Sequence, residues 1–266
     1  TGEITGTYRS TQSSSITVLV QDQGGQSVQR TFAIQANQPP PPQGTIGGLP
    51  QNPAPSLQPT ATLTIASPFP LEITGTLTLT FAPNAAVNAD DPTIRFANNT
   101  RTINFRIPAG QTQAIFEGSP AFQTGSTAGT ITLTAALNSG GQSVTTTQTV
   151  VIPRSAPTIT SATAQRSGNT ITLTVTGFST TRDITAMTLR LTGAASTNLQ
   201  TTELTPPVTQ AFATWFGSTQ GQSFGSEFRL SIPLTVEGDA ATAITGIQVV
   251  LTNSAGSSSP TNATIQ

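Results

Sequence analysis

The chain has 266 residues, 8% of them charged, with a formal net charge of −1 and neither cysteine nor histidine. Its ten basic residues are all arginine, so it lacks most of the nucleophiles, general bases and metal ligands with which enzymes work near neutral pH. The composition therefore predicts a protein that is not an enzyme and needs no cofactor or metal, and a charge near zero gives nucleic acid no electrostatic attraction.

Two strands joined by a glycine turn are predicted at residues 16–34, which read ITVLVQDQGGQSVQRTFAI. Asp22 stands just before the turn, where its carboxylate is expected to accept hydrogen bonds from nearby backbone N–H groups. Ile16, Val18 and Val20 alternate along the first strand, and we treat them as candidate interface residues.

Residues 1 to about 36 resemble a known bacterial family. Thr1-Gly2-Glu3-Ile4-Thr5-Gly6-Thr7, followed by Tyr8 and the strand from Ile16, resembles the second half of the bacterial cadherin-like Ig domain, of the acidobacterial type. Arg9 departs from the turn residue expected at its position. The resemblance implies a secreted or surface protein that carries domains in tandem.

A run of four prolines, Pro39–Pro42, predicts a short, stiff linker after this first segment. Beyond the linker, Thr76–Phe81 and Thr130–Thr134 alternate threonine with large apolar residues, as expected for half-buried antiparallel strands. Asp90 and Asp91 lie together before Pro92, and we interpret them as ordinary turn acids because too few carboxylates surround them for a calcium site.

The same alternation continues at Thr170–Val175 in the last part of the chain, and no stretch there predicts a helix. Five aromatic residues gather within a short stretch: Phe212, Trp215, Phe216, Phe224 and Phe228. Core packing is the favoured interpretation for this group. The alternative is a contact surface for protein or sugar, with Trp215 and Phe216 as interface candidates.

An internal repeat sets the domain organisation. The strand–turn–strand pattern of residues 16–34 recurs at 131–152 and 247–265, and its turn glycines Gly25, Gly141 and Gly256 are 116 and 115 residues apart. This spacing matches one immunoglobulin-like sandwich per repeat. Asn138 and Asn253 take the place that Asp22 has in the first repeat.

The predicted fold class is all-β, with tandem immunoglobulin-like antiparallel β-sandwiches. An incomplete Ig-like domain, its C-terminal part only, occupies residues 1–37, and the proline linker follows at 38–43. Complete sandwiches are predicted at 44–153 and 157–266, with a second linker at 154–156. The first segment lacks most of its strands, so either the chain is part of a longer one or another molecule supplies them.

The remaining sequence signals are weaker. Asn98 and Asn262 stand in N-glycosylation patterns, which arise readily by chance in a chain rich in threonine and asparagine. No apolar stretch approaches the roughly 20 residues that span a bilayer, so no membrane insertion is expected. No export signal is visible at Thr1, and we expect a mature product or a fragment of a longer chain.

The predicted function is a non-enzymatic, extracellular or cell-surface structural segment, a rod or spacer of tandem Ig-like domains within a parent multi-domain chain. The first alternative is a subunit of a self-assembling filament, a homo-oligomer in which strands of a neighbouring chain complete residues 1–36. The second alternative is carbohydrate or surface adhesion through the Trp215 region.

Overall fold

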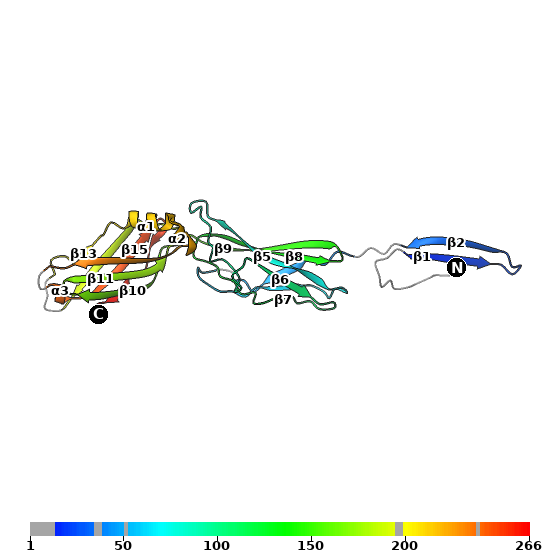
Figure 1. Ribbon diagram of the computed structural model, residues 1–266, viewed down its shortest axis with the longest axis horizontal. Coiled ribbons are helices and arrows are strands. Elements are labelled where there is room, and N and C mark those ends of the chain that lie inside the picture. The colour runs from blue at the N-terminus through cyan, green and yellow to red at the C-terminus, as the bar shows by residue number, and fades with distance from the viewer. Residues whose placement is uncertain (1–13, 35–38, 51–52, 195–198, 238–239) are drawn as a thin grey trace.

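The computed structural model describes residues 14–34, 39–50, 53–194, 199–237 and 240–266. The chain is elongated, with a β-hairpin at one end followed by two β-sandwiches that lie end to end (Figure 1). The motif of the cadherin-like Ig domain at Thr1–Thr7, with Tyr8 and Arg9, lies outside the described residues.

The hairpin pairs β1 (Ser14–Gln21) with β2 (Ser27–Ile34) in antiparallel register, from Ser14 opposite Ile34 to Gln21 opposite Ser27. The Asp22 carboxylate closes the turn, because its Oδ1 atom accepts hydrogen bonds from the backbone N–H groups of Gly24 and Gln26, each at 2.9 Å. This confirms the role expected of Asp22. Gly25 supplies the left-handed conformation of the turn, with φ of 83°.

The central sandwich places a five-stranded sheet, in the order β7-β6-β5-β8-β9, against the pair β3-β4. The strands of the larger sheet are β5 (Ile73–Pro83), β6 (Thr102–Ile107), β7 (Ile115–Phe116), β8 (Gly129–Ser139) and β9 (Gln142–Ile152). The smaller pair comprises β3 (Gly44–Gly47) and β4 (Thr62–Ile65). The alternating leucine and isoleucine side chains of both sheets form one core.

The hairpin of β8 and β9 turns more tightly than that of β1 and β2. Ser139 pairs with Gln142, and the two intervening residues, Gly140 and Gly141, have φ of 54° and 81°. Positive φ at both positions is the requirement of a type I′ turn, which matches the twist of antiparallel strands. Asn138 therefore stays within the ladder, opposite Ser143, and does not reach the turn.

The C-terminal sandwich has a three-stranded sheet, β10-β11-β14, and a five-stranded one built around β12 and β15. The first sheet contains β10 (Thr158–Ser167), β11 (Thr170–Phe178) and β14 (Glu227–Thr235). The second contains β12 (Ala186–Gly193), β13 (Glu203–Leu204), β15 (Ile244–Asn253), β16 (Gly256–Ser257) and β17 (Thr261–Thr264). Their inner faces form a second core, separate from the first.

The third repeat of the hairpin pattern is interrupted. β15 pairs first with the two-residue strand β16 and then, one residue out of register, with β17. Pro260, which has no N–H to donate, lies in the gap between them. The Asn253 side chain accepts hydrogen bonds from the N–H groups of Ala255 and Gly256, as predicted for this turn.

The sequence predicts no helix, and this prediction is wrong. Among the residues described in the C-terminal sandwich there are three short helices: α1 (Thr209–Gly217), α2 (Thr219–Ser223) and α3 (Ala240–Ala243). In α1, Phe212 and Phe216 are four residues apart, so both face the core, where Phe212 also packs edge-on against Phe228. Burial of these rings outweighs the weak helix propensity of Thr, Phe and Trp.

The chain is thus a mostly-β protein of tandem immunoglobulin-like sandwiches, with helices as local additions. Within the described residues, no helix is long and apolar enough to cross a membrane.

Candidate functional site at the joint between the sandwiches

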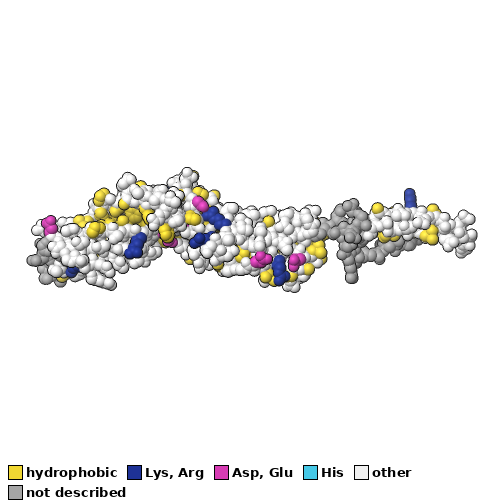
Figure 2. All heavy atoms as spheres, in the orientation of Figure 1, with side chains coloured by type: hydrophobic (Ala, Val, Ile, Leu, Met, Phe, Trp, Pro, Cys, Tyr) yellow, Lys and Arg dark blue, Asp and Glu magenta, His cyan; other side chains and the backbone are white. Residues whose placement is uncertain are grey.

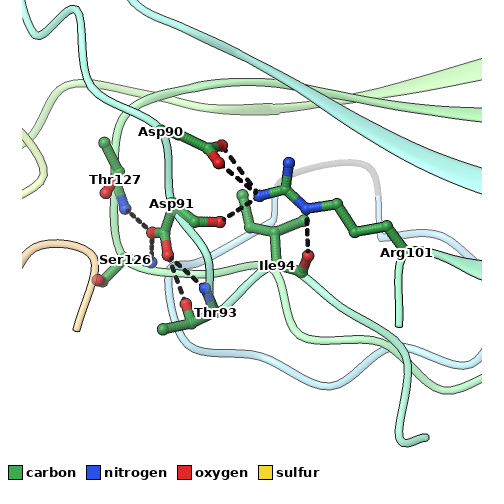
Figure 3. A network of polar contacts seen from close by, with 7 residues as sticks. All are labelled: Asp90, Asp91, Thr93, Ile94, Arg101, Ser126 and Thr127. Atoms are coloured by element: carbon green, nitrogen blue, oxygen red, sulfur yellow. Dashed lines mark hydrogen bonds and ion pairs between the residues drawn. The ribbon is translucent and has the colours of Figure 1, made fainter. Parts of the chain in front are cut away.

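The carboxylate of Asp91 is fully buried where the two sandwiches meet. It lies on the long loop between β5 and β6, and four hydrogen bonds hold it (Figure 3). One oxygen, Oδ2, accepts from the backbone N–H groups of Ser126 and Thr127, at 2.8 and 2.9 Å. The other accepts from the backbone N–H and the hydroxyl of Thr93. Four donors satisfy this carboxylate, which explains how it can be buried.

Arg101 fastens the same loop from the other side. Its Nη2 atom donates to the carboxylate of Asp90 at 2.9 Å and to the backbone oxygen of Asp91 at 2.8 Å (Figure 3). Its Nε atom donates to the backbone oxygen of Ile94 at 3.1 Å. The Asp90 side chain remains 60% exposed, so this ion pair with Arg101 positions the loop but contributes little stability.

Residues beside Asp91 form hydrogen bonds across the joint. The hydroxyls of Thr127 and Ser226 are 2.8 Å apart, and the Ser226 N–H donates to the Ser126 hydroxyl, also at 2.8 Å. The N–H of Ala128 donates to the backbone oxygen of Thr180 at 2.9 Å. Ser126, Thr127, Thr180 and Ser226 are at most 1% exposed, so the joint is a buried contact.

Two glycines let the backbones of both sandwiches approach the Asp91 carboxylate. Gly125 precedes Ser126 and Gly225 precedes Ser226, with positive φ of 68° and 63°. A Cβ atom added to either glycine would lie 2.6 Å from a carboxylate oxygen of Asp91. No side chain fits at these positions without displacing Asp91, so the close contact requires glycine.

The linker between the sandwiches is itself held by hydrogen bonds. The N–H of Ser155 donates to the Thr180 hydroxyl, and the Asn253 side chain donates to the backbone oxygen of Ser155, both at 2.8 Å. Arg154 donates to the Ser254 hydroxyl at 2.9 Å. The joint is therefore fixed by hydrogen bonds from several loops.

Arg182 braces the loops of the C-terminal sandwich at the joint. Its guanidinium donates to the backbone oxygens of Gly225 and Phe216 and lies over the Phe216 ring, 5.5 Å from the centroid. Burial lowers the pKa of Arg182, and the negative charge of Asp91 opposes that change. Arg182 itself has a φ of 54°, an uncommon conformation that its three contacts hold in place.

A groove of about 420 Å³ lies beside the joint. Its lining comes from the outer face of the β10-β11-β14 sheet, from α1 and from the segment after α2, with Ser56 of the central sandwich at its rim. The apolar part of the lining includes Trp215 and Phe224, which stack with ring centroids 6.2 Å apart. Figure 2 shows hydrophobic side chains gathered on the face of the C-terminal sandwich around α1.

Comparisons with known proteins assign no family to the chain: no family model and no curated protein matches it. Among solved structures, it is similar to Escherichia coli alpha-2-macroglobulin activated by porcine elastase, with 9% identity and a TM-score of 0.33 over 95% of this chain and 24% of that one. It is also similar to Salmonella alpha-2-macroglobulin reacted with methylamine, with 11% identity and a TM-score of 0.30, over 96% and 18% of the two chains.

The FN1–FN3 domains of chicken CNTN1 give 12% identity and a TM-score of 0.23, over 93% of this chain and 76% of that one. The chain spans about a quarter or less of the length of the two alpha-2-macroglobulins. Similarity at this level assigns no activity or partner to the chain.

The predicted interface residues lie in two separate places. Ile16 and Val20 are exposed and Val18 is half-buried, all on one face of the hairpin. Phe216 is 5% exposed and belongs to the core, so the single chain offers no Phe216 surface. Trp215, in contrast, lies at the groove, on α1 and not on a loop.

The glycosylation candidates Asn98 and Asn262 are both exposed. The Asn98 side chain accepts hydrogen bonds from Thr100, and that of Asn262 accepts one from Gln248. Their modification stays a prediction. Within the described residues, no three acidic side chains come close enough together to hold a metal ion.

Sequence reasoning missed the joint. The interpretation of Asp91 as an ordinary turn acid misses the burial of its carboxylate, and no pattern in the sequence marks Ser126, Thr127, Thr180 or Ser226. One signal was present: Gly125-Ser126 and Gly225-Ser226 each shortly precede a strand. The same dipeptide also occurs at 118–119, 217–218 and 256–257, so the signal does not single out the joint.

The charge of Asp91 also reaches Glu227, at the start of β14. Burial raises the pKa of the Glu227 carboxyl, and the negative charge of Asp91 raises it further. An acid whose pKa is raised by folding destabilises the folded state when the acid is ionised. This destabilisation decreases as pH falls through the raised pKa, and it is absent once the acid is protonated in both the folded and the unfolded state.

We therefore expect Glu227→Gln to raise the melting temperature at pH 7 and to leave it unchanged at pH 3. Calorimetry at the two pH values measures the difference, and an equal increase at both would contradict the stated cause.

Proposed function

We propose that the chain is a non-enzymatic, extracellular rod or spacer of tandem Ig-like domains, in which the joint around Asp91 fixes the relative orientation of the two sandwiches. The observation that carries the proposal is the buried hydrogen-bonded contact between Ser126-Thr127 and Ser226. Two domains linked only by a flexible segment would reorient freely, whereas a buried contact with defined donors and acceptors favours one arrangement.

The surface chemistry supports a presenting role. Threonine covers the outer faces of the strands, as in β11, where threonine alternates with buried Ile171, Leu173 and Val175. A surface with few charges and many hydroxyls binds water without attracting charged molecules non-specifically. This surface and the resemblance to tandem-domain surface proteins favour an extracellular location.

Small-angle X-ray scattering tests the rod. We expect a single elongated shape, with the two sandwiches end to end, in the wild type and in Pro153→Ala. Pro153 is exposed, and the hydrogen bonds of the joint, not this proline, hold the orientation. Wild-type scattering that requires many relative orientations of the sandwiches would contradict the proposal.

A specific observation favours self-assembly as a second candidate function. One face of the hairpin exposes five apolar side chains: Ile16, Val20, Val28, Phe32 and Ile34. Among the described residues, β1 pairs only with β2, so its other edge has no partner strand. In the central sandwich the equivalent strand, β8, buries the corresponding face and pairs with β5 as well as β9. A strand from a neighbouring copy, placed as β5 is, would complete the hairpin.

Light scattering across a range of protein concentrations tests this candidate with a matched pair of variants. Phe32→Thr removes an exposed ring from the apolar face, and we expect it to reduce assembly. Leu19, 61% exposed on the opposite face, provides the control Leu19→Thr, which is expected to assemble as the wild type does. A wild-type chain that remains monomeric at every concentration would eliminate the filament.

A further inference from the structure

The groove beside the joint has a rigid aromatic wall. Trp215 and Phe224 stack with an interplanar angle of 21°, and the indole Nε1 donates to the backbone oxygen of Glu227 at 2.8 Å. That bond fixes the orientation of the Trp215 ring. Phe224 remains 47% exposed although the core lies close by. A fixed, exposed aromatic pair is a suitable surface for the apolar face of a ring-shaped ligand.

Charged side chains without partners line the same groove. Glu227 and Arg229 are alternate residues of β14, so they point to one face, opposite Phe178 and Thr176 of β11. Within the described part of the chain, neither charged group forms a side-chain hydrogen bond or an ion pair. The groove therefore offers a free acceptor at Glu227 and free donors at Arg229.

Hydroxyl groups complete the polar lining. The hydroxyls of Thr160 and Thr176 are 3.2 Å apart on the floor of the groove, and Ser56 adds a third at the rim. Each hydroxyl can both donate and accept. Acceptors, donors and an aromatic surface thus converge in one hollow of a size typical of ligand sites, which occupy about 300–1,000 Å³.

The position of the groove on the sheet restricts its occupant. The floor is formed by side chains of β11, whose backbone already pairs with β10 on one side and β14 on the other. A peptide strand therefore cannot pair with β11, and a ligand that lies over β11 must be recognised by side chains. One negative and one positive group give the lining no net charge, which favours an uncharged ligand over a polyanion.

We propose that this groove binds a neutral oligosaccharide, with the apolar face of one sugar ring on Trp215 and Phe224. Sugar hydroxyls donate to the Glu227 carboxylate and accept from the Arg229 guanidinium. The inference is independent of the rod function, because the groups proposed to hold the sugar all belong to the C-terminal sandwich and form none of the hydrogen bonds across the joint. A rod that binds sugar in this way would attach to a polysaccharide surface along its side.

Tryptophan fluorescence tests the proposal directly, because Trp215 is the one tryptophan of the chain. The full chain is titrated with neutral oligosaccharides of glucose, galactose, mannose, xylose and N-acetylglucosamine. The highest concentration is about 10 mM, ten times a dissociation constant of roughly 1 mM. We expect at least one sugar to change the Trp215 emission in a saturable manner and the others to bind less tightly.

Variants locate the binding. Phe224→Ala and Arg229→Ala are each expected to weaken the binding about tenfold or more, as loss of a central contact does. Phe32→Ala, which removes a comparably exposed ring on the distant hairpin, is the control and should bind as the wild type does. Arg229 is exposed on a strand, so its variant tests the groove even if Phe224→Ala alters folding.

Three results would overturn the proposal. The first is emission that no oligosaccharide changes at the highest concentration. The second is unchanged affinity in both groove variants, which would place the sugar elsewhere. The third is an emission change that follows protein concentration without any sugar, which would assign the groove to a second copy of the chain. None of these results alters the scattering expected of the rod, so the two proposals fail separately.

Discussion

Replacing Asp91 by alanine is expected to destabilise the central sandwich by about 3–5 kcal/mol, because two buried backbone N–H groups and one partly buried one lose their acceptor, at about 1–3 kcal/mol for each buried group. Those donors belong to Thr93, Ser126 and Thr127. Asp91→Asn should have a smaller effect, because the amide oxygen still accepts from one pair of donors, and only the pair that then faces the NH2 group loses its acceptor. Urea unfolding of the wild type and both variants measures these differences.

The neighbouring Asp90→Ala variant is the matched control for Asp91. Asp90 is an aspartate of the same loop, but its carboxylate is bonded to Arg101 and is 60% exposed, so its loss should change stability by less than about 1 kcal/mol. Equal effects of the two substitutions would show that Asp91 is not the buried centre of the joint. The Asp91 variants should also broaden the range of orientations seen by small-angle scattering, whereas Asp90→Ala should not.

Gly225→Ala is expected to separate the two sandwiches without unfolding the C-terminal one. The added Cβ atom would lie 2.6 Å from both carboxylate oxygens of Asp91, so the loop must withdraw from the joint. Strain at the positive φ adds to this clash, and together they should cost about 2–4 kcal/mol. Limited proteolysis at residues 153–157, before and after the substitution, measures the opening of the joint.

Gly168→Ala separates the effect of backbone strain from the effect of the clash with Asp91. Gly168 has a φ of 58°, close to the 63° of Gly225, but nothing lies within 4 Å of its added Cβ atom. It therefore carries the backbone strain alone and should leave the linker as resistant to protease as in the wild type. If both variants opened the linker equally, the contact with Asp91 would not be what holds the sandwiches together.

The sequence was sufficient to predict the strands and turns that depend on local pattern. Alternation of threonine with leucine or isoleucine predicts β5, β8 and β11, because residues two apart share one face of a strand. Gly25, Gly141 and Gly256 all adopt positive φ, as their place in the repeated turn predicts. The role of Asp22 follows from the same short-range chemistry.

Long-range contacts could not be predicted in this way. Asp91 meets Thr127 only once the central sandwich has folded, and it meets Gly225 only when the second sandwich packs against the first, so the residues around Asp91 do not predict these partners. Helix α1 was missed although Phe212, Trp215 and Phe216 have helical spacing. Aromatic side chains favour strands over helices, and the packing of Phe212 on Phe228 in the folded core explains the helix.

The hydrogen bonds that cross the joint run between hydroxyls and backbone groups, and the buried carboxylate of Asp91 lies beside them. Because each core lies within one sandwich, separating the sandwiches should expose far less apolar surface than unfolding either of them, and heat-capacity change and urea dependence both follow the area exposed. Opening should leave almost no trace in either measurement. Water can bond every group that is released, so the open ends remain soluble and can close again. Under mechanical load, such a joint would act as a reversible extension that leaves both cores intact.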